Sequence, residues 1–172
     1  MESLRTARLF LRKFTIGDAP FILELLNSPD WLAHIGDRNL RSLGDARKYI
    51  REKYHATYDD SGVGAYLIQL AETEKSIGTV GLFKRPTLDY PDLGFALLPE
   101  YYRKGYALEA SQALIANVTS TYAIETIYGL TTAENASSKA LLSRLGFLQT
   151  DTVRLPDEDK EFLLFSYSAK SD

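Results

Sequence analysis

The hydrophobic pattern changes along the chain, and this change limits the protein to folds that combine a sheet with helices. Before residue 92, apolar residues recur in short strand-like runs at residues 7–14, 65–72 and 76–85, with two helical stripes between the first and second of these runs. From residue 92 onward, strand-like runs alternate with segments of helical periodicity. Such alternation is typical of helices that connect strands of one sheet, whereas the short polar turn after residue 72 is typical of a hairpin. We therefore expect an α/β (mixed α+β) fold around one central sheet.

Caps and turn residues place the expected elements. Asp18 is the predicted N-cap of the first helix, Asn135 is the predicted N-cap of the last, and Gly146 is predicted to end that last helix. The result is a mixed, mostly antiparallel sheet of about six or seven strands flanked by about four helices. No linker or internal repeat divides the 172 residues, so residues 1–172 are predicted to form a single domain. The expected strands are 7–14, 65–72, 76–85, 92–98, 126–132, 147–153 and 161–169, and the expected helices follow Asp18 and span 42–55, 106–122 and 135–146.

Composition and charge argue against several classes of function. The net charge of −3 argues against broad binding to nucleic acid, which usually needs a basic face. The chain has no cysteine, so a disulfide framework and a thiolate nucleophile are excluded, and with only two histidines we expect no metal site. No run approaches the roughly 20 apolar residues that cross a bilayer, and the N-terminus does not resemble a signal peptide. We expect no membrane partner and a cytoplasmic protein.

The segment "FALLPEYYRKGYALEASQALI" (residues 95–115) runs from an apolar strand through a basic turn directly into a helix. The turn carries Arg103, Lys104 and Gly105. A helix start has unpaired backbone N–H groups and partial positive charge, so it holds phosphate groups well. The spacing matches neither the P-loop nor the dinucleotide fingerprint. Taken alone, the turn fits an ordinary solvated loop as well as a phosphate site.

A second segment, "ENASSKALLSRLGF" (residues 134–147), begins another helix after a strand. Asn135 is suited to capping this helix, and Ser138 lies in its first turn. Both residues can be read as helix caps or as ligand contacts, and the residue types do not separate these readings.

Together the two segments resemble the GNAT acetyltransferase superfamily. In that family the pattern Q/R-x-x-G-x-G/A opens the helix that holds the coenzyme A pyrophosphate. Here "YRKGYA" occupies it, with Gly105 and Ala107 matching and Tyr102 replacing the usual glutamine or arginine. The pattern N-x-x-S-x-x-L…G-F, typical of the ribosomal-protein N-terminal acetyltransferase branch, is matched by Asn135, Ser138, Leu141, Gly146 and Phe147. The resemblance extends over residues 7–167.

The resemblance implies a GNAT-type domain in which two neighbouring strands splay apart and hold acetyl-CoA between them. It implies an N-acetyltransferase in which a primary amine attacks the thioester directly, with acetyl-CoA as co-substrate and no metal. Backbone N–H groups near Leu97 are candidates for stabilising the oxyanion. The implied cofactor-binding residues are Phe95, Ala96, Leu97, Leu98, Tyr102, Arg103, Lys104, Gly105, Tyr106, Ala107, Leu108, Asn135 and Ser138.

The implied catalytic residues are Ser138 and Asp92. Many family members carry a tyrosine acid where this chain has Leu142, so Ser138 is the candidate that meets the sulfur. Asp92 is the candidate general base. Asp92 can equally end the preceding turn, and water or bulk solvent can take the proton instead.

The family places the acceptor against the loop between the first two helices, here residues 27–42. Its candidate substrate-binding residues are Trp31, His34, Asp37 and Arg38. Asp37 could pair with an ammonium group and Arg38 with a carboxylate or phosphate, or the two could form a surface pair with each other.

The acceptor itself is left open by the sequence. The branch resemblance favours a protein N-terminal amine. The alternatives are a small amine, such as a polyamine, amino acid or aminoglycoside, and a non-catalytic acyl-CoA-binding module. A monomer and a homodimer are both compatible with the sequence.

Overall fold

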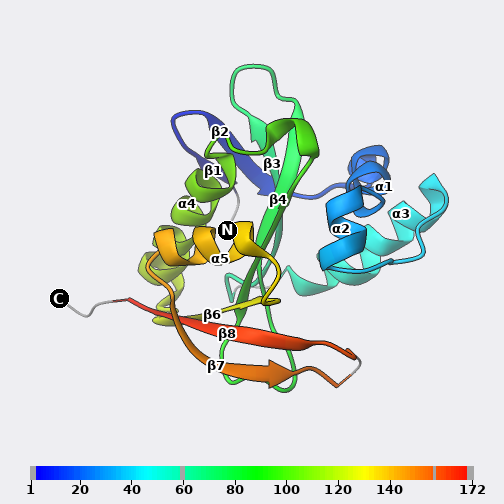
Figure 1. The fold of residues 1–172 in the computed structure, drawn as a ribbon. Coiled ribbons are helices and arrows are strands. Elements are labelled where there is room, and N and C mark those ends of the chain that lie inside the picture. Colours follow the sequence, from blue (N-terminus) through cyan, green and yellow to red (C-terminus); the bar gives the residue numbers. More distant parts are fainter. Residues whose placement is uncertain (1–2, 59–60, 157, 170–172) are drawn as a thin grey trace.

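The computed structural model describes residues 3–58, 61–156 and 158–169, which form one eight-stranded sheet with helices on both faces (Figure 1). The order across the sheet is β1-β2-β3-β4-β5-β6-β8-β7. The strands are β1 (Ser3–Arg5), β2 (Leu9–Lys13), β3 (Gly64–Leu70), β4 (Ser76–Phe83), β5 (Asp92–Leu97), β6 (Thr126–Thr131), β7 (Leu148–Arg154) and β8 (Glu161–Ser168).

Neighbouring strands in the described sheet are antiparallel except for the parallel pair β5 and β6. The predicted mixed, mostly antiparallel sheet is therefore confirmed. The strand count is one higher than the upper prediction, because β1 has only three residues and shows too little periodicity to be recognised.

The helices are α1 (Ala19–Leu26), α2 (Pro29–His34), α3 (Leu43–Tyr49), α4 (Tyr106–Tyr122) and α5 (Ala136–Arg144), with short helical turns at Ile16–Asp18, Ile50–Tyr54, His55–Thr57 and Pro99–Tyr101. Helix α2 lies in a segment that was predicted to be a loop. Ser28 adopts extended geometry before it and Pro29 occupies its first position, where a missing N–H costs nothing. With only six residues, the helix is too short to show periodicity.

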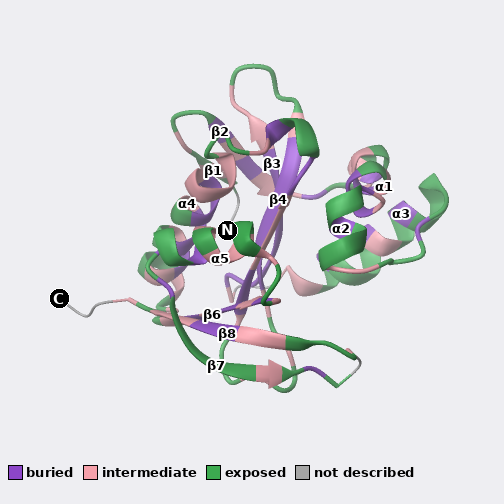
Figure 2. Cartoon of the chain, in the orientation of Figure 1, coloured by how far each residue is buried: buried purple, intermediate pink, exposed green. Residues whose placement is uncertain are grey.

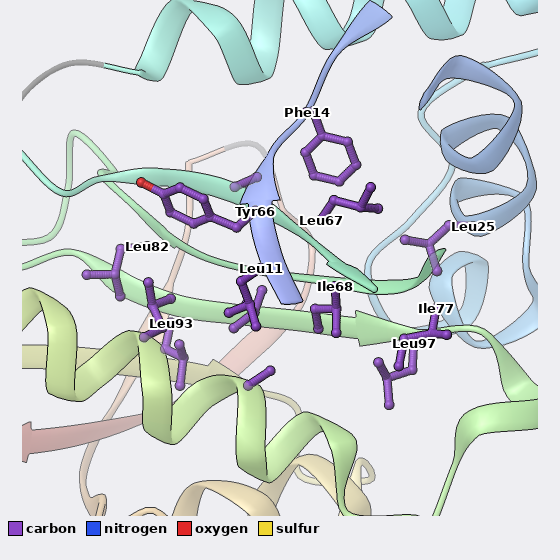
Figure 3. Close-up of a cluster of buried hydrophobic side chains, with 14 of the residues drawn as sticks. Leu11, Phe14, Leu25, Tyr66, Leu67, Ile68, Ile77, Leu82, Leu93 and Leu97 are labelled. Carbon is purple, nitrogen blue, oxygen red and sulfur yellow. The ribbon is translucent and has the colours of Figure 1, made fainter. Parts of the chain in front are cut away.

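Helices α1 to α3 lie on one side of the sheet, and α4 and α5 lie on the other (Figure 1). The central strands β3 and β4 are therefore buried on both faces (Figure 2). Figure 3 shows Leu67 and Phe14 on the side of the sheet that carries Leu25 of α1, while Leu82 and Leu93 lie toward α4. These two apolar layers hold the sheet rigidly from both sides.

The predicted caps are confirmed at α5 and differ at α1. The Asn135 side chain caps α5, and Gly146 follows its last turn at φ 89°, a conformation that favours glycine. Asp18 does precede α1 but makes no side-chain cap to it. Its carboxylate instead accepts hydrogen bonds from Thr15 N (2.7 Å) and from the Arg12 guanidinium (2.8 Å to each oxygen).

Within residues 3–58, 61–156 and 158–169, none of the helices combines the length and the apolar character needed to cross a bilayer.

Candidate active site

Strands β5 and β6 separate soon after they meet. β5 pairs with β4 from Asp92 to Leu97, but it pairs with β6 only at Asp92↔Tyr128 and Leu93↔Gly129. From Gly94 onward, the β6 side of β5 is an open strand edge among the described residues. The splayed strand pair that the family resemblance implied is therefore present.

The hydrogen bonds at the two ends of β5 show which backbone groups face the open side. Tyr128 N donates to Pro91 O (2.9 Å) across the β5–β6 boundary, whereas Leu98 N donates to Ile77 O (2.9 Å) on the β4 side. Because a strand alternates every residue, Phe95 and Leu97 direct their N–H and C=O groups toward the open side. Ala96 directs its groups toward β4, while Leu98 donates its N–H to Ile77 O and accepts from Tyr101 N (3.0 Å) with its carbonyl. Of the four predicted strand contacts, only Phe95 and Leu97 therefore offer backbone groups to a ligand.

The segment 102–105, called the basic turn below, leads from β5 into α4. Arg103 (φ 59°) and Gly105 (φ 80°) both adopt left-handed conformations. Gly105 is the N-cap of α4 and supplies no side-chain cap. The backbone N–H groups of Tyr106, Ala107 and Leu108 are the first of the helix and have no acceptor within it. Successive N–H groups in a turn of this kind form a concave site that binds anions.

Four cationic side chains surround the basic turn. Arg103 and Lys104 belong to it and are exposed. Arg8, from the turn between β1 and β2, donates from Nη1 to Lys104 O (3.0 Å), and Lys75, from the β3–β4 turn, lies with its Nζ 5.4 Å from the centroid of the Tyr101 ring. Arg8 and Lys75 were missed because they lie far from the turn in the sequence and belong to no motif. Arg103, Lys104 and Lys75 give this end of the molecule positive charge that attracts phosphate, whereas the charge of Arg8 is paired with Glu109.

Tyr102 joins the basic turn to α2. Its hydroxyl lies close to the Asp30 carboxylate in the first turn of α2. Burial, reinforced by this interaction with Asp30, raises the pKa of Tyr102 to about 12. The predicted cofactor and acceptor regions therefore contact each other directly through Tyr102 and Asp30.

The start of α5 lies beside the end of β6. Asn135 Oδ1 accepts hydrogen bonds from Ser138 N (3.1 Å) and from Ser137 Oγ (3.0 Å), so the capping role of Asn135 is confirmed. Ser138 is half-buried. Leu142, one turn further along α5, packs onto Gly129 of β6: a Cβ at Gly129 would lie 2.6 Å from Leu142 Cδ2. Ser138 therefore shares the sheet-facing side of α5, nearer to the C-terminal end of β6.

Thr131, the last residue of β6, is a further candidate that the sequence did not suggest. Its side chain is on the same side of the strand as Gly129, two residues earlier, and so faces α5. It is buried, and its Oγ1 has no hydrogen-bond partner among the described residues. Thr131 and Ser138 thus place two hydroxyl groups at the same end of the α5–β6 layer, alongside the part of β6 that β5 does not pair with.

Asp92 occupies the start of β5 and is 3% exposed. Arg85 donates to both of its carboxylate oxygens, from Nε to Oδ1 (2.7 Å) and from Nη2 to Oδ2 (3.3 Å). Burial raises the pKa of the carboxyl group, and the Arg85 hydrogen bonds oppose that effect. The predicted role as a general base stays a prediction. Elsewhere in the described residues, no three His, Asp or Glu side chains are grouped as metal ligands would be.

The four predicted acceptor residues are divided between the core and the surface. Trp31 is buried in α2, and its Nε1 has no hydrogen-bond partner among the described residues. His34, Asp37 and Arg38 are exposed. Asp37 accepts hydrogen bonds from the guanidinium of Arg41, which lowers its pKa. Of the alternatives for Asp37 and Arg38, a mutual surface pair is not what forms, because the Asp37 carboxylate pairs with Arg41 instead.

Comparison with known proteins identifies the family. The family model described as "Acetyltransferase (GNAT) domain" matches residues 8–148. The uncharacterized N-acetyltransferase YoaA of Bacillus subtilis is 26% identical over 152 residues, covering 88% of this chain and 85% of that protein.

Two solved structures share the fold at lower identity. One is a ribosomal-protein-S5-alanine acetyltransferase from Vibrio fischeri, with a TM-score of 0.78, 16% identity, and coverage of 98% of this chain and 97% of that one. The other is a spermidine N-acetyltransferase chimera from Vibrio cholerae and hSSAT, with a TM-score of 0.74, 18% identity, and coverage of 94% and 96%. At these identities the likeness concerns the fold alone. The match of the family model over most of the chain shows that this protein belongs to the GNAT acetyltransferase family.

Proposed function

We propose that this protein transfers the acetyl group of acetyl-CoA to a primary amine, and that the amine is the N-terminus of a protein or peptide. The observation that carries the cofactor assignment is the continuity of the open β5 edge with the uncapped, positively charged start of α4. We call the open edge of β5 (Gly94–Leu97) together with the basic turn the track. An extended ligand that ends in phosphates fits it.

The dimensions and chemistry of the track support this assignment. The open edge from Gly94 to Leu97 is roughly 13 Å long at about 3.3 Å per residue. The pantetheine arm carries two amides along a chain that such an edge can bind, as an added strand binds to a sheet. The phosphates would then reach the basic turn, where free N–H groups and cationic side chains bind anions. No residue of the track places a carboxylate on the open edge itself.

In the proposed mechanism, acetyl-CoA supplies the activated acetyl group and the protein positions it. The N–H groups of Phe95 and Leu97 orient the ligand along β5. Whichever of the two lies next to the thioester carbonyl donates a hydrogen bond to the carbonyl oxygen as negative charge develops on it. The Ser138 hydroxyl donates a hydrogen bond to the sulfur as it leaves. Since Arg85 holds both oxygens of the buried Asp92, we assign deprotonation of the amine to water.

The exposure of the acceptor region supports a peptide acceptor. His34, Asp37 and Arg38 lie on an open surface, whereas sites for small molecules usually enclose most of the ligand. A protein terminus needs only its last residues bound, and the rest of its chain can leave across such a surface. The similarity to a ribosomal-protein acetyltransferase agrees with this choice but concerns the fold alone.

Titration calorimetry with acetyl-CoA tests the cofactor assignment. We expect binding by the wild-type protein and its loss in Gly105→Trp, because the indole would fill the basic turn. Gly44→Trp is the matched control, since Gly44 is an exposed glycine in the first turn of α3, far from the basic turn. Absence of binding by folded wild-type protein would overturn the assignment.

Release of coenzyme A measured with a thiol reagent tests the acceptor. The chain has no cysteine, so the reagent would report only the released thiol. We expect peptides with a free N-terminus to accelerate release and the same peptides with a blocked N-terminus to have no effect. Faster release with spermidine or an aminoglycoside than with any peptide would assign a small amine instead.

A further inference from the structure

Arg8 connects the turn between β1 and β2 to the start of α4, about a hundred residues away in the sequence. Its Nε and Nη2 each lie 2.7 Å from Glu109 Oε2, and its backbone N lies 3.0 Å from Glu109 Oε1. Its Nη1 donates to Lys104 O at 3.0 Å, and the guanidinium carbon lies 4.6 Å from the centroid of the Tyr106 ring. One side chain thus contacts both the basic turn and the first turn of α4.

Without a cationic partner, the Glu109 carboxylate would repel a phosphate bound at the start of α4. It lies in the first turn of α4, where the helix dipole favours a negative charge of any origin. Burial alone would raise its pKa, but hydrogen bonds from Thr6 Oγ1 (2.6 Å) and Arg8 together lower it, so the carboxylate is charged. An uncompensated carboxylate there would repel a phosphate bound to the same helix start. Arg8 supplies the compensating charge and holds the carboxylate against the β1–β2 turn.

The contact with Lys104 O bears on the geometry of the basic turn. Lys104 lies between Arg103 and Gly105, both at positive φ, and a left-handed non-glycine residue costs roughly 1–2 kcal/mol. Such a conformation persists only where its surroundings hold it. Arg8 Nη1 binds the carbonyl between the two left-handed residues, and a Cβ at Gly105 would lie 3.3 Å from Arg8 Nη2. The guanidinium therefore covers the turn and holds one of its carbonyl groups, leaving the N–H groups of the helix start to face a ligand.

We propose that Arg8 is a positioning residue for the phosphates of the cofactor: it neutralises Glu109 and holds the Lys104 carbonyl, so that the start of α4 binds phosphate unopposed. This inference rests on the proposed function, since it concerns the same cofactor. The donor groups of Arg8 face the protein and not the ligand. Arg8 therefore affects phosphate binding through the basic turn, whose conformation it stabilises.

The test measures acetyl-CoA affinity by calorimetry, and kcat and KM by thiol release, for Arg8→Gln, Arg8→Lys and the double variant Arg8→Gln/Glu109→Gln. We expect Arg8→Gln to raise the Kd and the KM for acetyl-CoA by about tenfold, the size typical of a lost charge-assisted hydrogen bond, with kcat at saturating acetyl-CoA unchanged. We expect the double variant to recover part of this loss because the uncompensated carboxylate is removed. The acetyl-CoA affinity of Arg8→Lys should lie between those of the wild type and Arg8→Gln, since lysine keeps the positive charge but lacks the planar guanidinium.

Two controls separate positioning from general damage. Arg5→Gln removes another exposed arginine, on β1, whose guanidinium lies over the Phe10 ring, and should leave acetyl-CoA affinity unchanged. S-acetylpantetheine, which lacks the phosphates, should be used equally well by the wild type and Arg8→Gln. An equal loss with both acetyl donors, or no recovery in the double variant, would overturn the proposal.

The outcomes also separate this inference from the proposed function. If the wild-type protein binds acetyl-CoA and Arg8→Gln binds it with the same affinity, only the role of Arg8 is refuted. If the folded wild-type protein does not bind acetyl-CoA, both proposals are refuted together.

Discussion

Arg85 and Asp92 close the loop between β4 and β5 with a two-point ion pair, in which Arg85 Nε lies 2.7 Å from Asp92 Oδ1 and Nη2 lies 3.3 Å from Oδ2. Asp92 is almost fully buried, whereas the Arg85 side chain is 38% exposed. The pair stands where β5 begins and where its short pairing with β6 is located. It therefore holds the closed end of the splayed strands.

We expect Asp92→Asn to destabilise the protein without removing a catalytic group. Removing one partner of a buried ion pair leaves the other charge uncompensated, and the partial exposure of Arg85 moderates this cost to about 2–3 kcal/mol. Urea unfolding measures the change in the free energy of unfolding. The pH–rate profile of the folded variant should keep its shape, and loss of the limb that reports deprotonation would instead make Asp92 the general base.

Ser138→Ala should lower kcat while leaving acetyl-CoA binding intact. The serine hydroxyl is the proposed donor to the leaving sulfur, whereas the cap of α5 uses the Ser138 backbone N–H and is kept in the variant. Loss of one hydrogen-bond donor to developing charge typically costs about 10²-fold or more in kcat. Ser137→Ala is the matched control, because its hydroxyl bonds Asn135 at the exposed helix start. An unchanged kcat in Ser138→Ala would assign the sulfur contact to another group.

Thr131→Val should stabilise the protein or leave its stability unchanged. Thr131 Oγ1 is buried and has no hydrogen-bond partner in the part of the chain that the structure describes, and valine has nearly the same shape. Removing an unsatisfied buried hydroxyl recovers its desolvation cost, about 1 kcal/mol or more. Thermal unfolding measures the change. A substantially lower melting temperature would mean that the hydroxyl has a partner in solution, and comparing acetyl-CoA affinity would show whether a ligand supplies one.

The free energy of unfolding should fall in acid partly because the Asp18 carboxylate becomes protonated. Burial alone would raise its pKa, but the hydrogen bonds from Arg12 and Thr15, with the charge of Arg12, lower it below its usual 3.8. A folded-state pKa below the unfolded value gives a stabilisation that is complete above about pH 4 and is lost as the pH falls through the folded-state pKa. The difference in the free energy of unfolding between wild type and Asp18→Asn should therefore shrink as the pH falls below 4. A constant difference would show that the Arg12–Asp18 pair does not depend on charge.

Local patterns in the sequence predicted most of the fold because the longer strands and helices each carry their own period. The helix 106–122 was predicted with the observed bounds, since it has an apolar stripe and a glycine before it. Helix α2 and strand β1 were missed, because their existence depends on what they pack against.

The candidate site shows the same division. Gly105 and Asn135 were found because a turn and a cap need particular residue types locally. Arg8 and the Asp30 partner of Tyr102 act across the fold, so no spacing along the chain could reveal them. One alternative paired Asp37 with the adjacent Arg38, but its carboxylate pairs with Arg41, because sequence proximity does not determine which side chain reaches an exposed carboxylate.

β5 and β6 pair at only two positions in the described sheet, Asp92↔Tyr128 and Leu93↔Gly129. This short junction divides the sheet into two blocks, β1 to β5 and β6 to β8, which share few backbone hydrogen bonds. The blocks should therefore differ in amide hydrogen exchange, since each can open as its own cooperative unit. A ligand bound along β5 would add rungs at this junction and make the blocks open together. Its binding should thus slow exchange at residues on both sides of the junction, well beyond those it touches.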